Sequence, residues 1–498
     1  MKSGQSFNTI PPEIQLRIFG ILCSEGSLSS LKHLAMVCHD WKILAETAVL
    51  VPSIRHSACE QPNEVLLLAK QACGALRILD LGNTSLPIPP AALKHVATLC
   101  PNVTHLNLCQ FSQLSSSQLV FILHRMPRLQ HVNFTGLSAI TDIHLQILAR
   151  QSAKSLVTLL VSSCSRITDK GLGAILSKCP NLKTLKAANT QAFSDNILSL
   201  LTSLLEEIDI CGSQDIGTRF LQQAFLGHLD PTLYTALVPP IIDYVKPQDY
   251  NLPTPPLQFT PALIHISSLN LSNCVAAVTD DLLTILGWST PNLRIINLQD
   301  CARVTDVGIS RLAEGCLLLS ATNFSGCTLI GDVSLDALGM CCGRTLERVC
   351  LSKCPEITDE GVFDLVSQCT KLRLLILNDN PLLTDLLLQS LQKDPAPTLQ
   401  TLELEHCPNI SQRAVSTLLE RVNSLPQFKR LRRLSIESFS SLLSFNSVGS
   451  GERIVPASRR SVELVVVSSN GSNNIFGIAG GPRSNHNTMF DLENEDYW

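Results

Sequence analysis

Cysteine is the residue type whose number and spacing in this sequence could support chemistry. The chain has 19 cysteines, and thiolates bind metals or attack substrates where their pKa is lowered. Structural zinc sites use pairs a few residues apart. The sequence holds no Cys-x-x-Cys pair, and its close spacings, Cys341 with Cys342 and Cys350 with Cys354, fit a longer repeat.

Most cysteines belong to two series whose members are about 26 residues, or a multiple of that, apart. Metal ligands at that spacing would lie one to a structural layer, so the series favour packing, where cysteine acts as a small apolar residue and weak donor. We therefore expect reduced thiols, with no metal and no cofactor. The first series is Cys164, Cys274, Cys301, Cys327, Cys354 and Cys407, and the second is Cys73, Cys100, Cys179, Cys316 and Cys369.

Threonine–aspartate pairs recur with the same period. Each pair follows an Ile, Val or Leu and precedes a segment with helical apolar spacing, which is where Thr or Asp caps a helix. Their regularity favours a structural role. The histidines are scattered, and neither a nucleophile motif nor a glycine-rich phosphate loop occurs, so we expect no enzyme. The pairs begin at Thr141, Thr168, Thr279, Thr305, Thr358 and Thr384.

The elements that position these residues are repeats of the pattern Leu-x-x-Leu-x-Leu. A fixed period of 26 or 27 residues is the signature of leucine-rich repeats, each a short strand followed by a helix. The expected fold is an α/β solenoid, curved, with parallel strands inside, helices outside and a core shared between neighbouring units. The pattern starts at Leu76, Val103, Leu129, Leu156, Leu182, Leu205, Ile266, Leu293, Leu319, Leu346, Leu372, Leu399 and, less regularly, Leu431.

Composition excludes several classes of protein. The net charge is −4 with mixed signs, and without a basic stripe we expect no nucleic-acid partner. The N-terminus leads into no apolar signal segment, and no run reaches the ~18 apolar residues of a membrane span. We expect no membrane association and a cytoplasmic or nuclear location.

The repeats resemble the cysteine-containing subclass of leucine-rich repeats, in which a turn cysteine is followed by Ile-Thr-Asp-x-Gly. That subclass is found most often in F-box proteins. The N-terminus also resembles an F-box, with three blocks in the family's order: Ile10-Pro11-Pro12-Glu13-Ile14, Ile18-Phe19-Gly20-Ile21-Leu22 and Val37-Cys38-His39-Asp40-Trp41.

The resemblance implies a substrate-receptor subunit of an SCF-type (cullin-RING) ubiquitin ligase. Its F-box would bind the S-phase-kinase-associated adaptor, which links to the cullin/RING core, while the repeats hold a protein substrate for ubiquitination and proteasomal degradation. Such a receptor is non-catalytic, and we expect a monomer within the complex. The adaptor-binding residues implied are Ile10, Pro11, Ile14, Val37, Cys38 and Trp41.

The resulting domain organisation has six segments. An F-box-like helical bundle at 7–50 precedes a linker or degenerate first repeat at 51–75. Two repeat arrays, 76–224 and 263–437, flank a Pro/Tyr-rich insertion at 225–262. A Ser/Asn/Gly-rich tail, 438–498, is expected to be mostly disordered; its run Val462–Val467 is expected to form a strand or to fold back on the repeats.

Strand alternation places the residues two, four and six positions after each start on the inner, concave face. These positions are mostly small and neutral, with Lys186 and Arg348 as the cations, so we expect no multiply phosphorylated recognition motif in a substrate. The most apolar patch is the candidate substrate site, although the protein's own tail could also occupy it. Its residues are Arg348, Cys350, Leu374, Ile376, Glu403 and Glu405, and the insertion's Tyr234, Tyr244 and Tyr250 are further candidates.

The alternative to a ligase receptor is a stand-alone binding scaffold or inhibitor, similar in architecture to ribonuclease inhibitor. In that interpretation the N-terminal bundle only caps the first repeat. Recovery of the adaptor with the chain would distinguish the two.

Overall fold

The computed structural model describes residues 53–55, 62–83, 88–111, 114–190, 197, 200–201, 204–213, 264–393, 398–411, 413–415, 417–418, 433–437, 462–467 and 473–478. The chain divides into two compact units, Met1–Ser213 and Gln214–Trp498, which are described separately. The expected F-box and the insertion at 225–262 lie outside the described residues.

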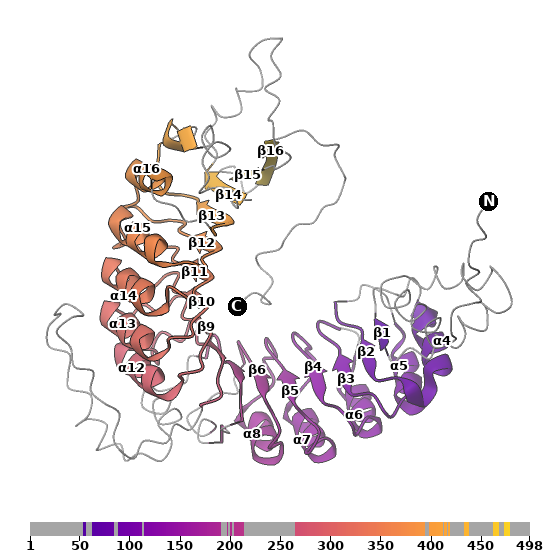
Figure 1. Cartoon of the computed structure of the whole chain (residues 1–498). Coiled ribbons are helices and arrows are strands. Elements are labelled where there is room, and N and C mark those ends of the chain that lie inside the picture. Colours follow the sequence, from indigo (N-terminus) through magenta and orange to yellow (C-terminus); the bar gives the residue numbers. More distant parts are fainter. Residues whose placement is uncertain are drawn as a thin grey trace, which may run out of the picture. The chain divides into compact units, whose positions relative to one another are not determined.

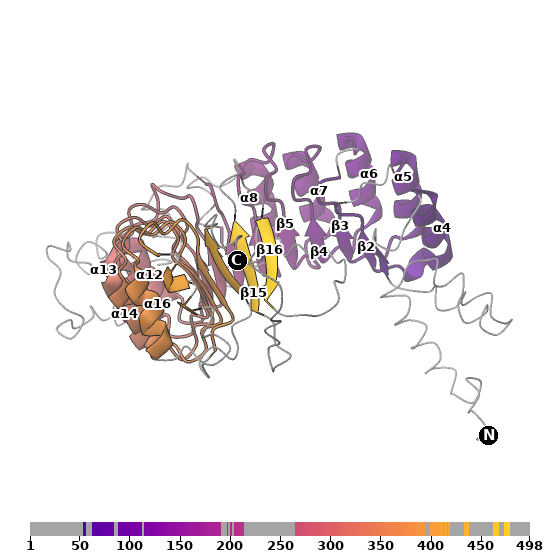
Figure 2. The same cartoon turned by 90° about the horizontal axis from the view of Figure 1, so that it is seen from above.

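The first unit alternates short parallel strands with helices (Figure 1). Its strands pair in chain order at constant register, as in Leu79 with Leu106 and Leu106 with Val132. The strands are β1 (Ser53–Arg55), β2 (Ile78–Asp80), β3 (His105–Asn107), β4 (His131–Asn133), β5 (Thr158–Leu160), β6 (Thr184–Lys186) and β7 (Glu207–Asp209). The helices, side by side in Figure 2, are α4 (Pro62–Ala72, followed by the 3-10 turn η3, Cys73–Ala75), α5 (Pro90–Leu99), α6 (Ser116–Arg125), α7 (Asp142–Gln151) and α8 (Asp169–Lys178).

The second unit repeats the same arrangement. Its strands are β8 (Ser268–Asn270), β9 (Ile295–Asn297), β10 (Ala321–Asn323), β11 (Arg348–Cys350), β12 (Leu374–Ile376), β13 (Thr401–Leu404), β14 (Arg433–Glu437), β15 (Val462–Val467) and β16 (Asn473–Ile478). Strands β8 to β15 pair in parallel and β16 pairs antiparallel with β15. The helices are α12 (Asp280–Ser289), α13 (Asp306–Gly315), α14 (Asp332–Cys342), α15 (Asp359–Gln368) and α16 (Asp385–Lys393).

The fold confirms the expected α/β leucine-rich-repeat solenoid. The segment 51–75, expected to be a linker or a degenerate first repeat, contains β1, which pairs in parallel with β2. In the tail, the Val462–Val467 run forms β15 and extends the sheet past β14. In the part of the chain that the structure describes, no helix is long and apolar enough to cross a membrane.

Each repeat turns after its strand through one residue in the left-handed backbone region. That residue lies seven positions after the start of the pattern in every one of the repeats from Leu76 to Leu399. Gly, Asn and Asp adopt this conformation at low cost, and they supply most of the positions. The residues are Asn83, Gln110, Gly136, Ser163, Asn189, Gly212, Asn273, Asp300, Gly326, Lys353, Asp379 and His406.

The turn cysteines are buried between layers and hydrogen-bonded to the preceding repeat. The thiol of Cys164 donates to the carbonyl of Phe134 at 3.1 Å, and that of Cys327 donates to the carbonyl of Leu298 at 3.2 Å. Cys301, Cys354 and Cys407 make the same bond. One repeat has Asn380 at this position instead, and its amide donates to the carbonyl of Leu351 at 2.8 Å. The expectation of packing thiols is confirmed.

These thiols are expected to resist alkylation in the folded protein. Burial raises the pKa of Cys327 and of Cys354 to about 12, so the reactive thiolate is scarce at neutral pH. Iodoacetamide at pH 8, followed by peptide mass spectrometry, should leave both unmodified until denaturant is added. Labelling of Cys327 as fast as that of the part-exposed Cys341 in native protein would contradict this packing.

The threonine–aspartate pairs form clamps between neighbouring helices. Thr168, Thr305 and Thr358 cap α8, α13 and α15. The aspartate of one repeat also accepts two bonds from the threonine of the next: Asp142 from the Thr168 backbone at 2.8 Å and from its hydroxyl at 2.7 Å. The same pair of bonds joins Asp280 to Thr305, Asp332 to Thr358 and Asp359 to Thr384.

In three of these four clamps the residue three positions after the threonine is a glycine that packs against the aspartate of the preceding repeat, and in the fourth it is Leu387. A Cβ at Gly171 would lie 2.6 Å from Oδ1 of Asp142 and 3.1 Å from its Cα, whereas at Gly173 it would meet only a Leu200 methyl at 3.8 Å. Gly171→Ala should therefore lower the free energy of unfolding by about 1–3 kcal/mol. Gly173→Ala in the same helix should raise it by up to ~1 kcal/mol. Urea denaturation measures the free energy of unfolding of both variants. Equal changes in the two would contradict the close packing of Gly171 against Asp142.

Candidate protein-binding surfaces

The concave rows of side chains follow from the short parallel strands. In most strands the central residue is buried and its two neighbours are part-exposed. Adjacent strands lie about 4.8 Å apart, so residues at equal positions form continuous rows across the sheet. The expected exposure two and four positions after each start is found in most repeats, but five of these side chains in the second unit are buried: Asn297, Ala321, Asn323, Cys350 and Glu403. Six positions after the start the outcome is mixed, because Cys109, Ser162 and Ser272 are buried at the strand exit.

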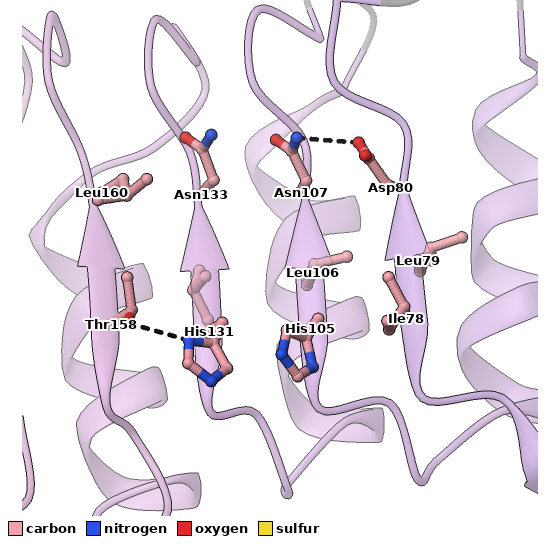
Figure 3. A pocket seen from close by; sticks show the side chains of 11 residues that line it. Ile78, Leu79, Asp80, His105, Leu106, Asn107, His131, Asn133, Thr158 and Leu160 are labelled. Atoms are coloured by element: carbon pink, nitrogen blue, oxygen red, sulfur yellow. Dashed lines mark hydrogen bonds between the residues drawn. The ribbon is translucent and has the colours of Figure 1, made fainter. Parts of the chain in front are cut away.

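A shallow hollow of about 200 Å³ lies over β2 to β5 of the first unit (Figure 3). Its centre is formed by His105 and His131, whose rings stack with centroids 4.2 Å apart. Beside them the amide of Asn107 donates to Asp80 at 2.9 Å. The apolar side chains of Ile78 and Leu160 also line the hollow.

Both imidazoles are held by threonine hydroxyls. Nδ1 of His131 is 2.9 Å from Oγ1 of Thr158, and Nδ1 of His105 is 2.9 Å from Oγ1 of Thr104. Oγ1 of Thr104 also lies 3.2 Å from the carbonyl oxygen of Arg77, so its single hydroxyl proton has two acceptors within reach.

Burial lowers the pKa of both histidines, and for His105 the neighbouring His131 lowers the pKa further. At neutral pH the pair is therefore uncharged. A hydroxyl beside an imidazole also occurs in catalytic pairs, but there a third group orients the base. Among the described residues no carboxylate bonds to His131. The hollow offers two imidazole rings and the Asp80 carboxylate to a partner's polar side chain.

In the second unit, the structure brings the expected candidate patch together on β11, β12 and β13. Two rows run across these strands: Arg348 beside Leu374, which pairs with Thr401, and Cys350 beside Ile376, which pairs with Glu403. Glu405 follows β13 directly. The part-exposed Leu374 and Ile376 thus lie between a cation on one side and carboxylates on the other.

Two members of the patch are less accessible than we expected. Cys350 is 4% exposed and Glu403 is 5% exposed, because side chains in one row pack against those of the strands on either side. Burial and the Glu403 charge raise the pKa of the Cys350 thiol well above its ordinary value. Cys350 is therefore neutral, and the accessible members are Arg348, Leu374, Ile376 and Glu405.

The alternative occupant of this patch, the protein's own tail, is described only in part. Strands β15 and β16 continue the sheet beyond β14 and do not lie across β12. The adaptor-binding candidates Ile10, Pro11, Ile14, Val37, Cys38 and Trp41 and the insertion tyrosines Tyr234, Tyr244 and Tyr250 lie outside the described residues.

The histidine pair was missed as a site in the sequence. His105 and His131 stand at the same position of adjacent repeats, and this equal position was the available signal for stacking. Among the described residues, no three His, Cys, Asp or Glu side chains gather so as to hold a metal ion.

Three curated proteins are similar to this chain at 22–27% sequence identity. The chain is 22% identical over 321 residues to DNA repair protein rhp7 of Schizosaccharomyces pombe, covering 63% of this chain and 46% of that protein. It is 27% identical over 242 residues to F-box/LRR-repeat protein 12 of Arabidopsis thaliana (41% and 56%) and 24% identical over 282 residues to F-box/LRR-repeat protein 4 of Bos taurus (54% and 39%). Two of these three similar proteins are F-box/leucine-rich-repeat proteins, matched at 24–27% identity.

The solved structures agree on the fold. The structure of the yeast Rad7 and Elc1 complex matches with a TM-score of 0.55 at 18% identity, covering 83% of this chain and 96% of that one. No family model matches the chain. The chain spans about half the length of these three curated relatives, between 39% and 56%.

Proposed function

We propose that this chain is a substrate receptor of an SCF-type ubiquitin ligase. The F-box-like blocks at its N-terminus would bind the S-phase-kinase-associated adaptor, and the concave face of the repeats would hold a protein substrate. The observation that carries the proposal is the apolar patch of Leu374 and Ile376, flanked by Arg348 and Glu405, in a chain whose relatives are F-box/LRR-repeat proteins.

The mechanism would be proximity. A receptor that holds a substrate lysine near a charged ubiquitin-conjugating enzyme raises the effective concentration of the two reactants. This chain would then need no catalytic residue, and it would work in the cytoplasm or nucleus beside the cullin/RING core.

Affinity purification of the full chain tests the adaptor contact. We expect the adaptor and the cullin to be recovered with the wild-type chain and lost with Trp41→Ala combined with Pro11→Ala, because an interface depends on a few buried anchors. Failure of the adaptor to co-purify with the wild-type chain would instead support a stand-alone scaffold or inhibitor whose N-terminal bundle is a cap.

Two further surfaces belong to this proposal. The insertion at 225–262 holds three of the chain's four tyrosines, a residue type enriched in interfaces, and its deletion should weaken substrate capture. Since the concave strand positions offer few cations, capture through this face should survive phosphatase treatment of the substrate.

A further inference from the structure

The net charge of −4 conceals a difference between two stretches of the chain, one in each unit. Residues 88–190 hold ten lysines and arginines against two aspartates, a formal charge of +8. Residues 264–393 hold nine basic and fourteen acidic residues, a formal charge of −5. A charge asymmetry of this kind within one chain indicates an anionic partner for the basic stretch.

The fold gathers part of this charge on one edge of the first unit. Because all strands are parallel, every helix there ends, and every following strand begins, at the same edge (Figure 2). Arg125, Arg150 and Lys178 stand in the last turns of α6, α7 and α8. Arg128 and Lys154 stand in the turns that lead into β4 and β5. These five side chains, all exposed, are called the basic rim, and the expectation that no basic stripe exists is wrong for this edge.

The basic rim is not neutralised by the nearby aspartates. Asp142 and Asp169 are at the opposite ends of α7 and α8, about 12–14 Å from the rim along the helix, beyond the ~8 Å screening length of physiological salt. Asp142 is also bound to Thr168. Among the described residues no carboxylate forms an ion pair with any rim side chain. The rim ends at Lys183, which pairs with Glu206 at 2.6 Å.

Compensation of the helix dipole is the ordinary reason for cations at helix C-termini. The second unit provides the comparison within the same repeat. The last turns of α12, α13, α14 and α15 carry no basic residue, whereas α16 ends at Lys393. Arg344 and Lys371 occupy the turns before β11 and β12 as Lys154 and Arg128 do before β5 and β4. The repeat therefore does not require cations at the helix ends, and three successive cationic helix ends are found in the first unit.

We propose that the basic rim binds the phosphodiester backbone of nucleic acid. The rim crosses three helices, about 16–20 Å at ordinary helix spacing, which matches the phosphates of roughly five or six nucleotides along one strand of a duplex. Its exposed neighbours Gln130, Gln151 and Asn181 are hydrogen-bonding groups.

A protein interface needs apolar anchors, and the rim offers few. From Arg125 to Lys183, the one strongly exposed large apolar side chain of the described residues is Ile143, which is at the other end of α7. The one aromatic ring in contact with a rim side chain among the described residues is that of Phe121, which is part-exposed and lies 5.4 Å from Arg125. This scarcity of apolar anchors favours phosphate contact without base readout.

A matched pair of double variants of the full chain tests this proposal. Arg150→Glu/Lys178→Glu reverses two rim charges, and Arg166→Glu/Lys170→Glu makes the same change in net charge at the opposite edge, where both side chains are exposed. Fluorescence anisotropy with labelled dT30 and with a 20-base-pair duplex of arbitrary sequence measures binding and distinguishes single strands from duplex. Circular dichroism confirms that both variants fold.

The rim variant should bind at least about tenfold more weakly at 0.1 M KCl, while the control stays within about threefold of the wild type. For the duplex, the slope of log K against log salt should be about −4.5 and fall in magnitude by about two in the rim variant. Equal losses in both variants, or no binding of either oligonucleotide by the wild type, would overturn the proposal. Competition by polyglutamate as strong as by unlabelled DNA would instead assign the rim to an acidic protein.

Discussion

Replacing Leu374 and Ile376 together with arginine is expected to weaken capture of the protein substrate about a hundredfold or more. Both side chains are part-exposed and neighbours on β12, so they can serve as the apolar anchors on which most of an interface's binding energy depends. Two guanidinium groups would have to be buried without partners, and truncated or unpaired anchors cost several kcal/mol. Quantitative pull-down of the substrate, found by proximity labelling, measures the change.

The control is Met340→Arg combined with Leu386→Arg in the same unit. Met340 and Leu386 are 65% and 61% exposed on α14 and α16. The two substitutions therefore add the same charge as the β12 variant, but on the helical side of the sheet. Substrate capture should be unchanged. An equal loss of substrate capture in the two double variants would show that the substrate does not bind through the concave face.

The largest expected effect on stability comes from Phe324→Ala. Phe324 is fully buried, and its carbonyl accepts the thiol of Cys354 at 3.4 Å from the next repeat. Removing a buried phenyl ring lowers the free energy of unfolding by about 3–5 kcal/mol, because the surrounding side chains only partly fill the cavity. In a solenoid each repeat contacts only its neighbours, so no distant packing offsets the loss.

Denaturation of the full chain followed by circular dichroism, with hydrogen exchange to locate the opening, measures this loss. The comparison variant is Phe121→Ala on α6, whose part-exposed ring lies under Lys94 and Arg125 at 5.7 and 5.4 Å. The free energy of unfolding of Phe121→Ala should fall by less than about 1.5 kcal/mol. A Phe324→Ala variant as stable as Phe121→Ala would show that the second unit is not packed as described.

The sequence predicted the repeat because one physical requirement recurs in each unit. Each layer must turn after its strand, so the left-handed residue is found seven positions after every start from Leu76 to Leu399. The threonine caps were predictable for the same reason. Their second role, as clamps between helices, was not, because the partner of Asp142 is 26 residues away in Thr168.

The candidate surfaces were only partly predictable. Strand alternation gave the rows that contain Leu374 and Ile376, but not the burial of Cys350 and Glu403, which depends on the side chains of neighbouring strands. The basic rim was missed because charge was summed over the whole chain. Only the parallel arrangement brings Arg125, Arg150 and Lys178 to one edge.

The central claim is that one chain binds a ligase adaptor and a substrate through separate surfaces. The most direct test is a quantitative affinity purification that compares the wild type with Trp41→Ala/Pro11→Ala and with Leu374→Arg/Ile376→Arg. We expect the first variant to lose the adaptor and cullin but keep the substrate, and the second to lose the substrate but keep the adaptor. Loss of both partners in either variant, or no adaptor with the wild type, would contradict the claim.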